Sequence, residues 1–76
     1  MNNWEKLSQA RIAVAGLIEL RDEINSRAWR LNDIEQQTEM ATSLEEIQAV
    51  AAMLTNFKRR SDEIKVEMKR LKDLIG

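Results

Sequence analysis

The chain has 76 residues with no cysteine, histidine or proline and a net charge of −1, so it holds one domain at most and offers neither a disulfide nor a His/Cys metal site. A compact monomer of this size buries only about 60% of its extended-chain surface, and a thin rod buries less. We therefore expect self-association or another protein to supply the missing contacts.

The first expected helix runs from about residue 3 to 38. Gly16 in its interior predicts close approach by another backbone or a bulky side chain, because glycine costs about 1 kcal/mol relative to alanine there. A break at Asn25-Ser26 would instead give three shorter helices. The helix carries a mostly apolar heptad repeat, typical of a face that packs on another helix. Its members are Leu7, Ala10, Val14, Leu17, Arg21, Ile24, Ala28, Leu31 and Glu35.

A turn is expected at about 39–42 and a second helix at about 43–75. Thr42 with Glu45, or Ser43 with Glu46, can form a capping box at its start. The heptad repeat of this helix has a single polar member, which indicates a strong packing face. The repeat consists of Ile47, Val50, Leu54, Phe57, Ser61, Ile64, Met68, Leu71 and Ile75.

Together these elements predict an all-α fold, with residues 1–76 forming one antiparallel, coiled-coil-like helical hairpin. Folding the chain about residue 40 pairs Ile24 with Phe57 and Arg21 with Ser61, so that the two polar interruptions face each other. The turn end is acidic and the open end is basic. This asymmetry could favour two hairpins that lie head to tail.

A second apolar line flanks the repeat on each helix. We expect it to stay on the outside of the hairpin and to join two copies into a four-helix bundle, making the protein a homodimer. The candidate self-association residues are Ala13, Leu20, Ile34, Met53 and Leu74.

Four further apolar residues lie off the repeat and form the candidate surface for another protein. Trp29 either lies over Ala51 or Thr55 or anchors a partner, since tryptophan is enriched among interface hot spots. The surface consists of Trp29, Ile18, Ile12 and Val66.

Lys58, Lys65 and Lys72 recur every seven residues, about 10 Å apart along the helix. Such a ladder either follows a nucleic-acid phosphate backbone or is a solvated helix face. Acidic residues on the first helix are expected to be solvated as well, with Glu23 and Arg27 forming an ion pair across one helix turn.

No residue pattern indicates catalysis, because the chain lacks His, Cys, Tyr and a glycine-rich loop. We expect no enzyme activity, cofactor, metal or small-molecule substrate. The longest apolar run, residues 12–18, is too short for a membrane span of about 20 residues, and a cytoplasmic location is the default. The predicted function is a non-enzymatic protein-protein interaction module: an adaptor, small chaperone or inhibitor. The alternative is a small nucleic-acid-binding regulator that uses the three lysines of a dimeric bundle.

Overall fold

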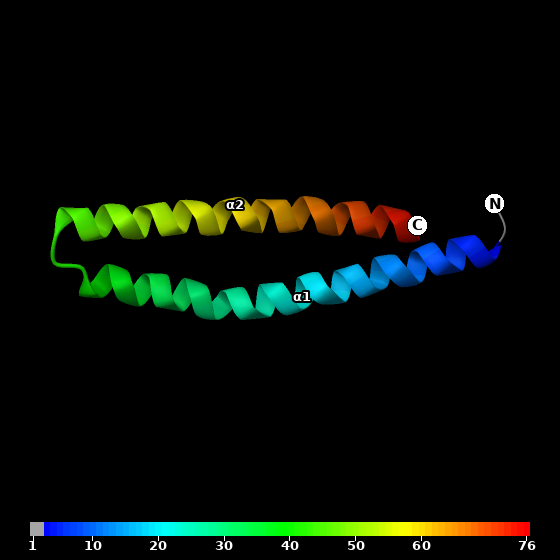
Figure 1. Ribbon diagram of the computed structural model, residues 1–76, viewed down its shortest axis with the longest axis horizontal. Coiled ribbons are helices and arrows are strands. Elements are labelled where there is room, and N and C mark those ends of the chain that lie inside the picture. The colour runs from blue at the N-terminus through cyan, green and yellow to red at the C-terminus, as the bar shows by residue number, and fades with distance from the viewer. Residues whose placement is uncertain (1–2) are drawn as a thin grey trace.

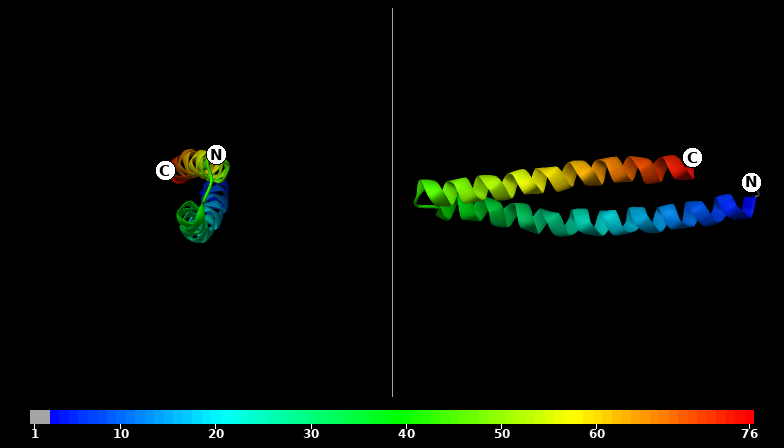
Figure 2. Two further views of the ribbon diagram at one scale, coloured as in Figure 1. Left: turned by 90° about the vertical axis from the view of Figure 1, so that its left-hand side faces the viewer. Right: turned by 45° about the horizontal axis from the view of Figure 1, so that its top comes forward.

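The computed structural model describes residues 3–76 as an all-α hairpin (Figure 1). Helix α1 runs over Asn3–Met40 and helix α2 over Leu44–Ile75, and residues 41–43 connect them. The helices pack antiparallel along their length (Figures 1 and 2), and the Cα atoms extend over 62 × 16 × 11 Å. The predicted hairpin is confirmed, with helix ends within two residues of the expected positions.

Helix α1 is continuous across Asn25 and Ser26, so the chain does not form three shorter helices. Ser26 Oγ donates a hydrogen bond to the backbone carbonyl of Asp22 at 3.1 Å. A serine that bonds the carbonyl four residues earlier satisfies its hydroxyl inside the helix, and such bonds often accompany a bend. Near this point α1 bows gently away from α2 (Figure 1).

The turn contains no glycine or proline, and side-chain caps at the start of α2 define it. Ser43 has an extended backbone, with φ −137° and ψ 159°, and its Oγ accepts a hydrogen bond from the Glu46 backbone N–H at 3.2 Å. Glu46 Oε2 in return accepts one from the Thr42 backbone N–H at 2.9 Å. The expected pairing of Ser43 with Glu46 is therefore confirmed, and it satisfies backbone donors at the start of α2.

The hairpin core lies along one line of each helix. The buried members of α2 belong to its heptad repeat. The buried members of α1 belong to the line that the sequence places on the outer flank, and that placement was wrong. Residues of the α1 repeat such as Val14 and Ile24 stay more than 40% exposed. The buried side chains are Ala13, Leu20 and Ile34 of α1 and Val50 and Ile64 of α2.

This rotation of α1 keeps Arg21 and Glu35 out of the contact with α2. Both lie on the predicted line, and burying them there would desolvate two charges without good partners. From Ala13 onward, the line that does face α2 has one charged member, Arg27, and α2 supplies its hydrogen-bond acceptors. Its other members are apolar: Ala13, Leu20, Ile34 and Ala41.

Small residues allow the helices to approach near the open end. A Cβ atom at Gly16 would lie 3.0 Å from Leu71 Cδ1. The expectation that Gly16 marks a close approach is confirmed, and the approaching group is the Leu71 side chain.

The register differs from the predicted one by about one helix turn. Because the turn centres on Thr42 and not on residue 40, the partners of α1 residues shift toward the C-terminal end of α2. Arg27, and not Arg21, meets Ser61. The Arg21 side chain is 67% exposed and lies 3.5 Å from Asp22.

Candidate protein interface

One face of the hairpin carries apolar side chains from both helices that are left partly uncovered. Within each helix its members lie seven residues, or a multiple of seven, from another member, so they point to one side. We call this set the apolar face, and each member is between 36% and 48% exposed. It consists of Leu7, Val14, Ile24 and Leu31 of α1 and Ile47, Leu54 and Ile75 of α2.

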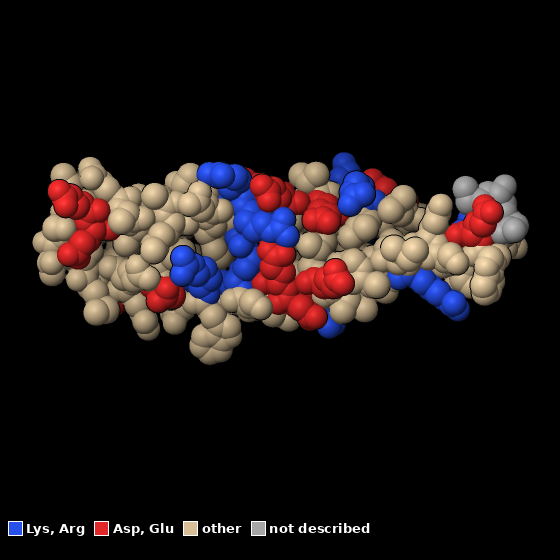
Figure 3. Space-filling view, in the orientation of Figure 1, with Lys and Arg blue, Asp and Glu red and all other residues tan. Residues whose placement is uncertain are grey.

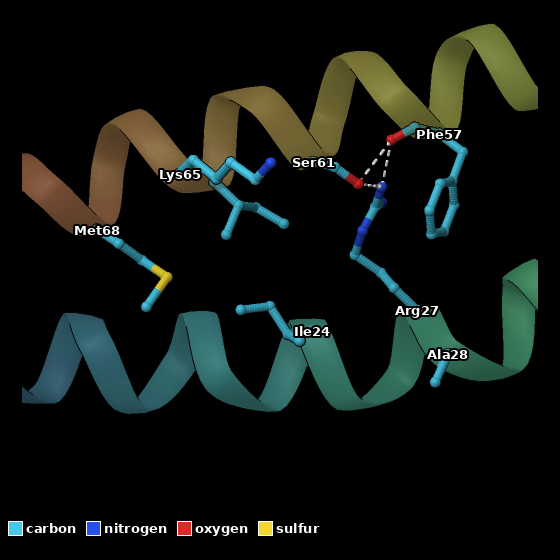
Figure 4. Close-up of a pocket in the computed structure, with 8 residues that line it drawn as sticks. Ile24, Arg27, Ala28, Phe57, Ser61, Lys65 and Met68 are labelled. Atoms are coloured by element: carbon cyan, nitrogen blue, oxygen red, sulfur yellow. Dashed lines mark hydrogen bonds between the residues drawn. The ribbon is translucent and has the colours of Figure 1, made fainter.

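The two helices share this face because their side chains line common hollows. One hollow of about 310 Å³ lies near the middle of the hairpin, and its lining includes Ile24 and Ala28 of α1 and Phe57 and Met68 of α2 (Figure 4). In the next groove along the hairpin, Leu31 lies across from Leu54. Such a surface offers a partner's apolar side chains a place to pack.

Arg27 spans the helices beside the hollow. Its Nη2 donates hydrogen bonds to Ser61 Oγ at 2.8 Å and to the Phe57 backbone carbonyl (Figure 4). The guanidinium carbon lies 4.0 Å from the centre of the Phe57 ring, a cation–π contact. Ser61, the single polar member of the α2 repeat, thus serves as the acceptor for the one arginine in the α1 contact line.

The opposite face of the hairpin is charged. In Figure 3, acidic and basic side chains meet across the two helices near the middle of the molecule. Figure 4 looks from the other side, since α2 runs in the reverse direction there with α1 still below it. The charged side chains in Figure 3 thus gather on the side of the hairpin away from the hollow of Figure 4.

A two-point ion pair joins the helices on the charged face. Arg60 donates from Nε and Nη2 to the two carboxylate oxygens of Glu23, both at 2.6 Å, and from Nη1 to Glu63 at 3.3 Å. The hydrogen bonds from Arg60 hold the pKa of Glu23 below its ordinary value. The same bonds, from Glu23 first and then Glu63, raise the pKa of Arg60. The expected Glu23 pair with Arg27 is replaced by this cross-helix pair.

The candidate self-association residues do not lie where the sequence places them. Ala13, Leu20 and Ile34 are buried inside the hairpin, at 1%, 6% and 3% exposure, and cannot face a second copy while the hairpin is intact. Met53 is half-buried, and Leu74 is exposed.

The residues of the candidate surface for another protein are all exposed. Trp29 is 78% exposed, so its ring does not rest on α2 as one reading expected. Ile12, Ile18 and Val66 are exposed too. Charged residues of α2 alone line the depression around Val66, and the three α1 residues do not border it.

The three candidate nucleic-acid-binding lysines are all exposed. Lys58 and Lys65 line the groove that contains Leu31 and Leu54, so they stand at the edge of the apolar face. Within the described part of the chain, Lys58, Lys65 and Lys72 form no ion pair.

Sequence reasoning missed the Glu23–Arg60 pair and the Arg27 contact with Ser61. The sequence contains one indication of the Arg27 contact: Arg27 follows Ala13 and Leu20 at seven-residue spacing, so it lies on the same side of α1. The sequence contains no indication of the ion pair, because a contact between residues 37 positions apart can be predicted only when the register of the two helices is known.

Residues 3–76 contain no group of three or more acidic side chains placed to hold a metal ion. Neither α1 nor α2 is long and apolar enough to cross a membrane. Comparison with known proteins returns no matching family model, no matching curated protein and no matching solved structure.

Proposed function

We propose that the protein is a non-enzymatic protein-protein interaction module, an adaptor, small chaperone or inhibitor, whose hairpin associates with a second copy. The observation that carries this proposal is the apolar face. It extends from the open end of the hairpin, at Leu7 and Ile75, to the turn end, at Ile47. Two such faces packed together would form a four-helix bundle, the common way for hairpins to cover an apolar side.

The exposed area supports a second copy as the occupant. The hairpin exposes 6185 Å², whereas a compact protein of its mass exposes about 4,800 Å². Its radius of gyration of 17.9 Å compares with about 11 Å for a compact chain of this length. The excess of about 1,400 Å² exceeds the roughly 800 Å² that each partner buries in a standard stable interface. A symmetric dimer would remove such an excess from both copies at once.

The test is the mass of the full chain in solution, measured by sedimentation over a wide concentration range. We expect a dimer that dissociates on dilution. Ile24→Ser, on the apolar face, should raise the dissociation constant at least tenfold, because the symmetric dimer loses the side chain twice. Ile12→Ser is the control, since it makes the same change on the same helix at a more exposed position away from that face. A wild-type monomer at every concentration, or equal effects of the two variants, would contradict the proposal.

A nucleic-acid-binding regulator is the second candidate, favoured by the unpaired, exposed Lys58, Lys65 and Lys72. It predicts that a labelled RNA or DNA duplex binds with an affinity that falls steeply with salt. Changing all three lysines to glutamate should then abolish binding and leave helicity intact. Equal retention of wild type and triple variant on the nucleic acid would reject this candidate.

A further inference from the structure

We infer that the two copies lie head to tail, with the turn end of one hairpin on the open end of the other. This inference rests on the proposed self-association and adds the direction of the partner. The charge distribution of the hairpin favours this direction, and its unequal helices and the apolar side chains at its ends fit it.

The two halves of the hairpin carry opposite net charge. The turn half, residues 25–57, has five acids against the two bases Arg27 and Arg30, a net of −3. The open half, residues 3–24 and 58–76, has ten bases against eight acids, a net of +2. Head-to-tail packing places each negative half on a positive half. Turn-on-turn packing places like charge on like charge, which costs free energy at low salt.

The helices also differ in length. Helix α1 has 38 residues and α2 has 32, and the start of α1 projects beyond the end of α2 (Figure 1). A projecting end on this hairpin therefore has no cover from its own α2. In a turn-on-turn dimer the two projections would lie together at one end, and both turn ends would lie at the other.

Large apolar side chains sit uncovered at both ends of the same face. Trp4 precedes Leu7 by three residues and is 68% exposed, and Leu44 precedes Ile47 by three residues and is 72% exposed. Each therefore extends the apolar face by one helix turn. The apolar face thus extends to the projecting start of α1 and to the start of α2, and its side chains at both places are exposed to water.

A two-fold axis near Ile24 brings these ends together. Ile24 lies at the level of the middle of α2, because its neighbour Glu23 pairs with Arg60. Leu7 is 17 residues away and Met40 is 16 residues away, which is about 26 Å and about 24 Å along the helix. The projection of one copy therefore ends over the turn of the other, where Trp4 can pack on Leu44.

Distances between spin labels in the dimer test the direction. The chain has no cysteine, so single substitutions Ser8→Cys, Asp22→Cys and Gln36→Cys place one label on each copy. All three residues are exposed and share one side of α1, at 14-residue spacing, away from the apolar face. Head-to-tail packing predicts axial separations of about 48, 6 and 36 Å respectively. Turn-on-turn packing predicts nearly equal distances at the three sites and would overturn the inference.

A label-free measurement accompanies the distances. Attraction between opposite halves predicts that the dissociation constant rises severalfold between 50 and 300 mM NaCl, as salt screens it. A constant that falls over this range would overturn the head-to-tail arrangement. The mass of each labelled variant separates the two claims: a monomer contradicts the self-association itself, whereas a dimer with equal label distances contradicts only its direction.

Discussion

Gly16→Ala should stabilise the hairpin although the glycine lies in a tight contact. Alanine in a helix interior is favoured over glycine by about 1 kcal/mol. Against this gain, the new Cβ would lie 3.0 Å from Leu71 Cδ1, closer than the usual 3.5–4.0 Å between carbon atoms. Leu71 is only half-buried, and the atom in question is the far end of its side chain. Leu71 can therefore move aside, and a net gain of about 0.5 kcal/mol should remain.

A double-mutant cycle isolates the two contributions. In a Leu71→Ala background the close neighbour is gone, so Gly16→Ala should gain the full 1 kcal/mol or so. Ala15→Gly, at the exposed neighbouring position, calibrates the propensity with the opposite sign. Unfolding is followed by circular dichroism at 222 nm at one fixed chain concentration, where 1 kcal/mol shifts Tm by about 4–8 °C. If Gly16→Ala destabilises the hairpin equally in both backgrounds, Leu71 is not what the glycine accommodates and the reasoning fails.

Three further changes probe the core, the cap and the ion pair. Leu20→Ala should lower the free energy of unfolding by about 2–3 kcal/mol in urea titrations, whereas Trp29→Ala should change it by less than about 0.5 kcal/mol. A larger loss for Trp29→Ala than for Leu20→Ala would mean that Leu20 lies on the outside of the hairpin and not in its core. Ser43→Ala should cost about 1 kcal/mol through the lost cap, while Thr42→Ala, which keeps the backbone N–H that Glu46 accepts from, should be nearly neutral in the same titration. Glu23 has a lowered pKa in the folded chain, so its contribution to stability is present above its ordinary pKa of 4.5 and is lost as pH falls through the folded value. Glu23→Gln should therefore make the urea midpoint fall less between pH 7 and 3 than it does in wild type, and parallel curves would contradict the role of the pair.

The sequence was sufficient for the helices and the direction of the hairpin. Nine positions of α2 at heptad spacing include just one polar residue, Ser61, and the buried Val50 and Ile64 are among them. The repeat did not separate these buried residues from Ile47, Leu54 and Ile75, which stay more than 36% exposed. Ser43 and Glu46 marked the start of α2 because their side chains cap a helix in a way that the backbone alone cannot.

The rotation of α1 was out of reach because this helix has two apolar lines. One passes through Val14 and Ile24 and the other through Leu20 and Ile34, and periodicity alone does not rank them. What separates them is whether a charged member finds an acceptor on α2, as Arg27 does. The same error changed the candidate interface. Leu20 and Ile34 were expected on the outside and are buried, whereas Val14 and Ile24 were expected in the core and are exposed.

The short connection at residues 41–43 has a consequence for how copies could exchange parts. Its residues, Ala41, Thr42 and Ser43, are all compatible with a helix, and only the hydrogen bonds of Ser43 and Glu46 mark the stop. A chain that straightened there would become a single rod about 110 Å long. Two such rods, side by side and antiparallel, could recreate every α1–α2 contact between molecules, which is domain swapping. A substitution that weakens the cap would thus favour a domain-swapped dimer although every residue of the core stays the same.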